Sequence, residues 1–183
     1  MSSGTLRAKL ATMRLAHAAA LLALAAPALA AGPGIPAALQ PPAGEHLVLK
    51  AHATGVQIYV CVPGADGASQ WTLKAPEAQL RDARGSPVIH HFAGPTWQHR
   101  DGSEVTGKVA ARVDSPDPHS IAWLLVTVAS HSGEGVLAAV TSIQRIRTHG
   151  GQPPAASKCD GATRDAEIRV PYSADYYFYA PGS

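Results

Sequence analysis

The chain has 183 residues with 15 basic side chains, 13 acidic side chains and a formal net charge of +2. Three of the basic residues, Arg7, Lys9 and Arg14, lie in the first thirty positions, which leaves twelve basic against thirteen acidic residues in the remainder. That remainder therefore carries a net charge of about −1 and has no cationic surface suited to nucleic acid or anionic lipid. We expect no nucleic-acid partner.

The first thirty residues have the pattern of a secretory signal peptide. A basic start is followed by the apolar run LAHAAALLALAAPALA, which ends in an A-x-A cleavage site at residues 28–30. The run is too short and too rich in alanine to span a bilayer, which needs about 20 strongly apolar residues. We expect residues 1–30 to be removed and the protein to be exported, to the periplasm or the extracellular space, with no membrane span.

The chain contains two cysteines, Cys61 and Cys159. Export exposes them to an oxidising compartment, and two cysteines permit only one intramolecular pairing. We predict a disulfide between Cys61 and Cys159.

The segments that follow residue 30 predict a lead-in and then strands. Residues 31–44 are rich in proline, glycine and alanine without periodicity, which predicts a flexible lead-in. From residue 45 onward apolar and polar residues alternate with the period of a strand, and the Thr54-Gly55 step suggests a hairpin. Pro76 to Ala83 is the one plausible helix, and at most a short helical turn is expected there.

The second half of the chain continues the strand pattern. Asp101-Gly102 is a strong hairpin signal, and residues 121–130 are apolar on both faces, as in a strand that is covered on each side. Residues 140–147 alternate again and place Arg145 and Arg147 on one face. Many short strands separated by turns predict an all-β fold, an antiparallel β-sandwich or barrel with long loops, as one domain over residues 45–183.

Several phrases of the sequence occur together and in the same order in a known family. The chain resembles an exported bacterial and fungal family that is catalogued as domain-of-unknown-function family 3455. The resemblance covers residues 42–179 and implies no activity, substrate or cofactor, although relatives have sometimes been labelled malate dehydrogenase. The phrases that carry it are GVQIYVC, WTLKAPEAQL, HHFAGPTW, DGSEVTGKV, WLL, VTSIQR, THGG and VPYSADYYFY.

The dehydrogenase label has one possible basis in the sequence, because GEGVLA at residues 133–138 fits G-x-G-x-x-A. A dinucleotide site needs this turn to open a helix, and it needs an acidic residue about 20 positions later. Here the following segment has strand character, and GGQPPAAS at residues 150–157 contains no acid. The sequence favours a glycine-rich turn over a nicotinamide-dependent oxidoreductase.

The stretch from His90 to Lys108 concentrates histidines beside a tryptophan. Neighbouring residues on a strand point to opposite faces, so His90 and His91 do not share one site unless a bulge re-aims one of them. No H-x-H or H-E-x-x-H spacing occurs after residue 30. We predict no metal and no other cofactor, and we expect a strand, a Gly94-Pro95 corner and a packed Trp97.

A binding function follows from the aromatic and basic residues. Aromatic faces stack on flat ligands and sugar rings, and Arg145 and Arg147 either hold an anionic group or pair with acids on a neighbouring strand. We predict a binding or surface-associated module for a small molecule or a glycan. The candidate pocket residues are His90, His91, Trp97, His131, Glu134 and Arg145.

The alternative is a hydrolytic or metal-dependent enzyme that uses His90 or His91 together with His131 and Glu134. The sequence contains no G-x-S-x-G motif, and nothing singles out a pair of carboxylates, so no catalytic residue is assigned. Convergence of His91, His131 and an acid in one concave pocket would favour the enzyme. Histidines that lie apart, each bonded to backbone, would favour binding or a structural role.

Overall fold

A computed structural model describes Met1 and residues 34–65 and 67–182, and residues 2–30 of the predicted signal peptide and residues 31–33 of the lead-in lie outside this part of the chain. In the described residues no helix is both long enough and apolar enough to pass through a membrane. Within residues 34–65 and 67–182, two short 3-10 turns, η1 (Ala37–Leu39) and η2 (Ala156–Lys158), accompany eight strands. The strands are β1 (Glu45–Pro63), β2 (Ser69–Arg81), β3 (Pro87–Phe92), β4 (Thr96–His99), β5 (Glu104–Val113), β6 (Trp123–Ser132), β7 (Ser142–Gly150) and β8 (Glu167–Pro181).

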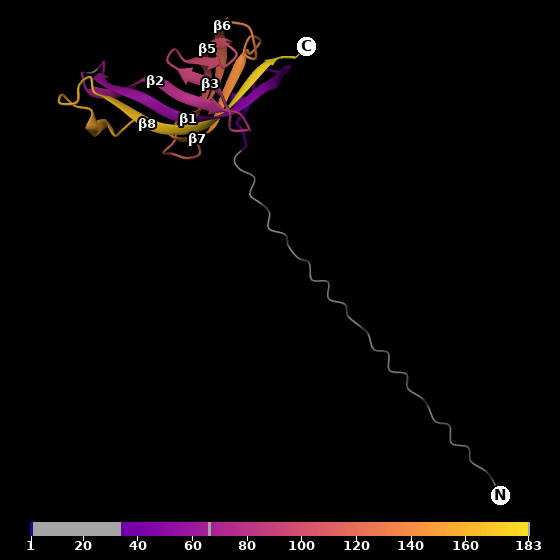
Figure 1. Cartoon of the computed structure of the whole chain (residues 1–183). Coiled ribbons are helices and arrows are strands. Elements are labelled where there is room, and N and C mark those ends of the chain that lie inside the picture. The colour runs from indigo at the N-terminus through magenta and orange to yellow at the C-terminus, as the bar shows by residue number, and fades with distance from the viewer. Residues whose placement is uncertain (2–33, 66, 183) are drawn as a thin grey trace. The chain divides into compact units, whose positions relative to one another are not determined.

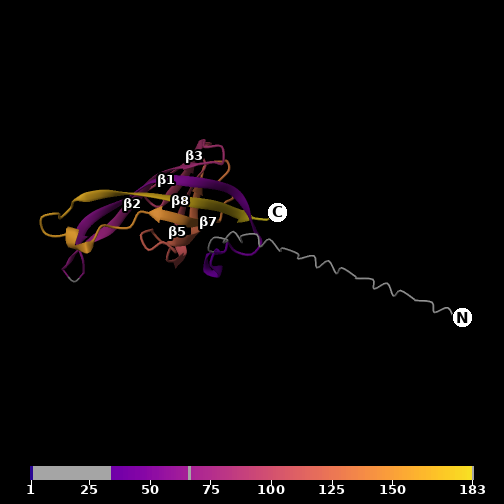
Figure 2. The ribbon, with the colours of Figure 1, turned by 90° about the horizontal axis from the view of Figure 1, so that it is seen from below.

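The strands form one closed antiparallel barrel in which each strand pairs with its neighbours in sequence (Figure 1). The first and last strands close it, because β1 pairs with β8 from Glu45 opposite Pro181 to Val60 opposite Glu167. Figure 2 shows β8 lying between β1 and β7, its two partners. The prediction of an all-β fold is confirmed, with the barrel as the observed one of the two architectures.

Two local predictions are wrong. No hairpin occurs at Thr54-Gly55, because β1 runs unbroken from residue 45 to 63. Gly55 instead allows β2 to approach closely, since a Cβ there would collide with the backbone of Glu77 and Ala78. The short helical turn expected at Pro76 to Ala83 is also absent, because β2 continues through Arg81.

The turn predicted at Asp101-Gly102 and the corner at Gly94-Pro95 both join adjacent strands, as expected. Gly102 has a φ of 94° between β4 and β5, and the N–H of His99 donates to the carbonyl oxygen of Ser103 at 2.8 Å. Gly94 has a φ of 128° between β3 and β4. A positive φ is the conformation in which glycine is favoured over residues with a Cβ.

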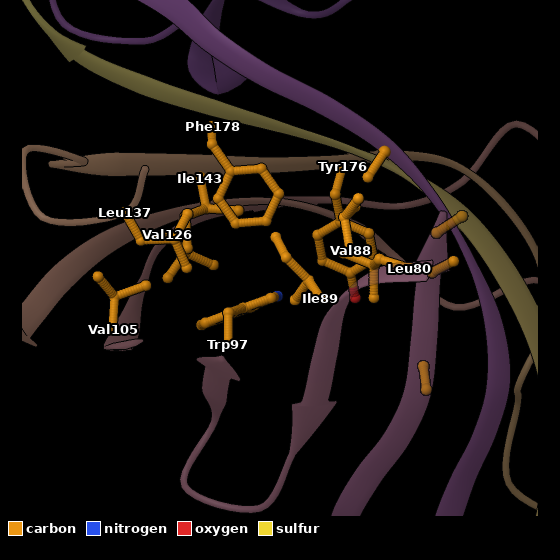
Figure 3. Packing of buried hydrophobic residues seen from close by; sticks show 14 of the residues in the cluster. Leu80, Val88, Ile89, Trp97, Val105, Val126, Leu137, Ile143, Tyr176 and Phe178 are labelled. Atoms are coloured by element: carbon orange, nitrogen blue, oxygen red, sulfur yellow. The ribbon is translucent and has the colours of Figure 1, made fainter. Parts of the chain in front are cut away.

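The core fills one part of the barrel interior with inward-pointing side chains of all eight strands and of the turn before β7. Figure 3 shows Phe178 and Tyr176 from β8 on one side of this cluster and Trp97 from β4 on the other, with Ile89 from β3 beside Trp97. The aromatic groups also contact one another, since the Trp97 and Tyr176 ring centroids lie 6.3 Å apart with their planes at 63°.

A second cluster covers the outside of the barrel and includes the described part of the predicted lead-in. Leu39, at the end of η1, is fully buried and packs with Trp123 and Ile146. Gln144 donates from Nε2 to the carbonyl oxygen of Leu39 at 2.6 Å. This cover explains the apolar character of β6 on both faces, because its inner side meets the core and its outer side meets the segment that carries Leu39.

The disulfide between Cys61 and Cys159 is present and links the end of β1 to the long β7–β8 connection. Both cysteines are buried. Two backbone hydrogen bonds support the same junction, from the N–H of Asp165 to the carbonyl oxygen of Cys61 and from the N–H of Cys61 to that of Ala166. The bridge therefore fixes a long connection that is built mainly of short turns, among them η2.

Reduction of this bridge is expected to lower the free energy of unfolding markedly. The two cysteines are 98 positions apart, and closing a loop of about this length removes up to roughly 4–5 kcal/mol of chain entropy from the unfolded state. Urea unfolding with and without reductant measures the difference, and a C61S/C159S double variant is the control that reductant should not affect. Equal unfolding midpoints for the wild-type protein in both conditions would contradict the prediction.

Candidate functional site

The barrel wall is incomplete where the β3–β4 hairpin is shorter than its neighbours. Residues 69–77 of β2 pair with β1 alone, and β5 beyond Gly107 pairs with β6 alone. Pro76 lies in this edge portion of β2, where the missing N–H of proline is tolerated. Two large apolar side chains flank the opening, Leu73 with 50% of its surface exposed and Val109 with 56%.

Two cavities of about 390 Å³ each lie behind this opening. They are contiguous, because five side chains line both: Gln57, Leu73, Val109, Leu124 and Arg145. These residues lie on five different strands, β1, β2, β5, β6 and β7. The side of the barrel next to the gap is therefore hollow, whereas the core described above fills the rest.

Three aromatic rings form one wall of the first cavity. The imidazole of His91 stacks on the indole of Trp97, with centroids 4.3 Å apart and planes at 9°. The ring of Tyr176 meets His91 edge-on at 5.6 Å. A flat apolar wall of this kind suits stacking with a planar ligand.

The protonation state of His91 follows from its environment. Its Nδ1 lies 2.8 Å from the carbonyl oxygen of Thr96, and since a carbonyl only accepts, Nδ1 carries the hydrogen and donates. Burial lowers the pKa of His91 to about 3, against a smaller raising effect of the bond to Thr96. His91 is therefore a neutral imidazole at physiological pH, with Nε2 as its hydrogen-bond acceptor.

Three side chains that line the cavities, Gln57, Trp97 and Arg145, have a buried hydrogen-bonding atom without a partner among the described residues. Gln57 is 2% exposed, and its Nε2 has no hydrogen-bond partner among the described residues. Arg145 donates from Nη2 to the carbonyl oxygen of Ala122 at 2.9 Å, whereas its buried Nε has no partner in the same part of the chain. Buried donors of this kind are uncommon in native proteins and mark positions where a ligand or water completes the bonding.

Arg145 and Arg147 do not share a face, contrary to the alternation predicted from the sequence. The β7–β8 ladder is irregular between Ile146 and His149, and Arg147 has a φ of +50°. This bulge turns Arg147 outward, where Nη1 donates to Asp175 at 3.3 Å and to the hydroxyl of Tyr177 at 2.7 Å. One arginine therefore pairs with an acid, and the other lines the cavities.

The remaining predicted pocket residues lie elsewhere. His90 points outward from β3 and contacts Phe92, with ring centroids 4.9 Å apart. His131 bonds through Nε2 to the carbonyl oxygen of Val140 at 2.7 Å. Glu134 is exposed in the turn between β6 and β7. The structure thus brings together His91, Trp97 and Arg145, and it separates them from His90, His131 and Glu134.

The turn that carries Glu134 is held by Asp101. The Asp101 carboxylate accepts hydrogen bonds from the N–H and hydroxyl of Ser103 at 2.9 and 2.6 Å and from the N–H of Val136 at 2.8 Å. These bonds, led by the Ser103 hydroxyl, hold the pKa of Asp101 far below its usual range. Gly135 leaves room for the carboxylate, and Leu137 becomes fully buried in the core.

The described residues contain no group of three or more histidine, cysteine, aspartate or glutamate side chains placed to hold a metal ion. After Gly135 the chain makes a turn and then enters β7, a strand, where a dinucleotide site would need a helix. The enzyme alternative uses His90 or His91 together with His131. His91 bonds to the carbonyl oxygen of Thr96 and His131 to that of Val140.

Comparison with known proteins identifies the family. A family model described as a protein of unknown function, DUF3455, matches residues 42–180. The chain belongs to this family. No curated protein and no solved structure matches the chain. The DUF3455 match runs from the residues just before β1 to the penultimate residue of β8, so it covers all of the barrel except Pro181.

Sequence reasoning missed several cavity residues of this DUF3455 barrel, above all Gln57. A signal was present, because Gln57 alternates with Tyr59 and Cys61 on one face of β1. The disulfide prediction implied that Cys61 is buried, and Gln57 shares its face. Leu73 and Val109 carried no such signal, because their place at the opening depends on the length of the β3–β4 hairpin.

The low pKa of His91 predicts a specific acid sensitivity. The unfolded histidine, with a pKa of about 6.5, gains a proton below that pH, whereas folded His91 remains neutral until about pH 3. Stability therefore falls as the pH falls through this window. Relative to His91→Gln, the wild-type protein should lose about 2 kcal/mol between pH 7 and pH 5. His90→Gln, which removes the exposed neighbour, should keep the wild-type profile. If the unfolding free energies of the wild-type protein and of His91→Gln change by the same amount over this pH range, the prediction is wrong.

Asp101→Asn should lower the melting temperature at pH 7, because the amide cannot replace a carboxylate that accepts three hydrogen bonds. The lowered pKa of Asp101 determines how its contribution to stability changes with pH. The contribution of Asp101 is present above the usual aspartate pKa of about 3.9 and is lost as the pH falls below it. Melting curves from pH 7 to pH 2 should show the two proteins converging in acid. Asp114→Asn, at an exposed ion pair, is the control.

Proposed function

We propose that this protein is exported and binds a small, largely apolar molecule inside its barrel. The observation that carries the proposal is the pair of contiguous cavities behind the gap between β2 and β5. Ligand sites are concave, mostly apolar and provided with a few fixed polar groups, and barrels commonly hold such ligands in their interior. The buried disulfide is consistent with export to an oxidising compartment.

The character of the walls favours an apolar molecule over a glycan. Leu73, Val109, Leu124 and Val126 supply aliphatic surface, and Trp97 supplies a flat ring. A sugar needs several hydrogen-bonding groups around its hydroxyls, whereas most of the surface that lines the first cavity is apolar. A planar or aliphatic molecule instead buries its surface against these walls at little polar cost.

The separation of the candidate histidines supports binding over hydrolysis. His91 and His131 bond to the carbonyl oxygens of Thr96 and Val140 respectively, and no acid lines either cavity. A general base needs to lie within hydrogen-bond reach of the proton that it removes, and a nucleophile needs such a base. The cavities hold no pair of this kind.

A neutral fluorescent probe, N-phenyl-1-naphthylamine, tests the proposal. The probe should bind saturably and fluoresce more strongly in the presence of the protein, because it moves from water into the apolar cavities. Val109→Trp should weaken binding at least about tenfold, since the larger side chain occupies the opening. Ile168→Trp is the matched control, because Ile168 is also partly exposed but lines neither cavity. A probe that shows no saturable binding, or binds both variants equally, would contradict the proposal.

A further inference from the structure

The charge of the cavity walls is unbalanced. Three cationic side chains line the two cavities, Lys74, Arg112 and Arg145, and no aspartate or glutamate does. Walls of one sign with a low-dielectric surrounding concentrate their field on the enclosed space. The cavities are therefore electropositive, although the barrel as a whole carries nearly equal numbers of acids and bases.

Of these three cations, Arg145 differs from the other two in its pairing. Lys74 forms an ion pair with Glu167, and Arg112 lies 3.7 Å from a carboxylate oxygen of Asp114. No carboxylate of the described residues lies within 4.0 Å of a charged nitrogen of Arg145. A partly buried cation without a counter-charge is unfavourable in the unliganded protein, and an anion placed beside it removes that cost.

The free hydrogen-bond donors of Arg145 suit a planar anion. A guanidinium has five N–H donors in a rigid fork that matches a carboxylate. In Arg145 the described residues engage one of them, through Nη2 to Ala122, and the buried Nε–H is left without a partner. Gln57, which lines both of the same cavities, adds the two hydrogens of an unpartnered Nε2.

The neighbours of Arg145 in the barrel explain how the group is presented. In register it lies between Leu124 on β6 and Tyr176 on β8, and both of these side chains line the first cavity. Apolar and aromatic surface thus surrounds a single free cation. Such an arrangement suits a molecule with an apolar or flat body and one anionic end.

We propose that the ligand is an amphipathic monocarboxylate whose carboxylate binds Arg145 and Gln57 while its apolar body lies against Leu124, Val126 and Trp97. This inference rests on the proposed function, because it names the chemical class that the cavities hold. Lys74 and Arg112, which are already paired at the opening, steer the anion inward and contribute less to its affinity.

The test compares 2-naphthoate with its methyl ester, which has the same aromatic body and no charge. Displacement of N-phenyl-1-naphthylamine from the wild-type protein at pH 7 should show that the acid binds about ten- to a hundredfold more tightly than the ester, the range expected of a charge-assisted bond. Arg145→Met should abolish this preference, because it removes the cationic partner that the acid has and the ester lacks. Arg147→Met, at the outward-facing arginine, is the matched control and should bind like the wild type.

The melting temperatures of the Arg145 variants test whether these proteins fold. Replacing an unpaired, partly buried cation by an apolar side chain of similar length should leave the melting temperature equal or higher. Arg145→Lys keeps the charge but loses the fork, and it should give an intermediate preference for the acid.

The possible failures are distinct. If neither the probe nor the two naphthyl compounds bind, the proposed function is wrong, and so is the proposed ligand class. If the acid and the ester bind the wild-type protein equally well, the cavity binds small molecules but the carboxylate inference is overturned. If the acid is preferred and Arg145→Met keeps that preference, Arg145 is not its partner.

Discussion

The pairing of β1 with β8 is the interaction on which the rest of the structure depends. It joins the two ends of the sheet along nearly the whole of both strands, from Glu45 opposite Pro181 to Val60 opposite Glu167. Without this pairing the sheet would have two open edges and no interior. With it, successive residues of each strand point alternately into the enclosed space and outward, and this alternation determines which side chains are buried.

Closure does not fill that interior evenly. Inward-facing Phe178, Ile143 and Leu137 pack tightly at one side, and the bonds of Asp101 secure the turn that supplies Leu137. On the other side β3 and β4 are too short to reach along the full lengths of β2 and β5. The cavities therefore result from unequal strand lengths. The stacked rings of His91 and Trp97 lie at the boundary between the packed core and the first cavity.

The sequence predicted those features that depend on alternation within one segment. It placed His90 and His91 on opposite faces, and the structure buries His91 and exposes His90. It failed where a local pattern had two interpretations. The Thr54-Gly55 step resembles a turn, but Gly55 permits close approach of β2, a contact that only tertiary structure reveals. Arg147 leaves the face of Arg145 because of a bulge, and the alternation of the sequence continues through that position without a sign of it.

The same bulge gives the two arginines their different roles. Arg147 reaches Asp175 outside the barrel and satisfies its charge there. Arg145 remains inside, where Nε and the neighbouring Gln57 Nε2 lack partners in the described chain. Selection for stability alone would favour apolar side chains in place of Arg145 and Gln57, because unpaired buried donors and charges are destabilising. Exceptions to the rules of stable packing gather at functional sites. Six described side chains have a buried polar atom without a hydrogen-bond partner, and three of them, Gln57, Trp97 and Arg145, line these cavities. The cavities lie behind the stretch of the described barrel wall where β2 and β5 lack a partner on one side.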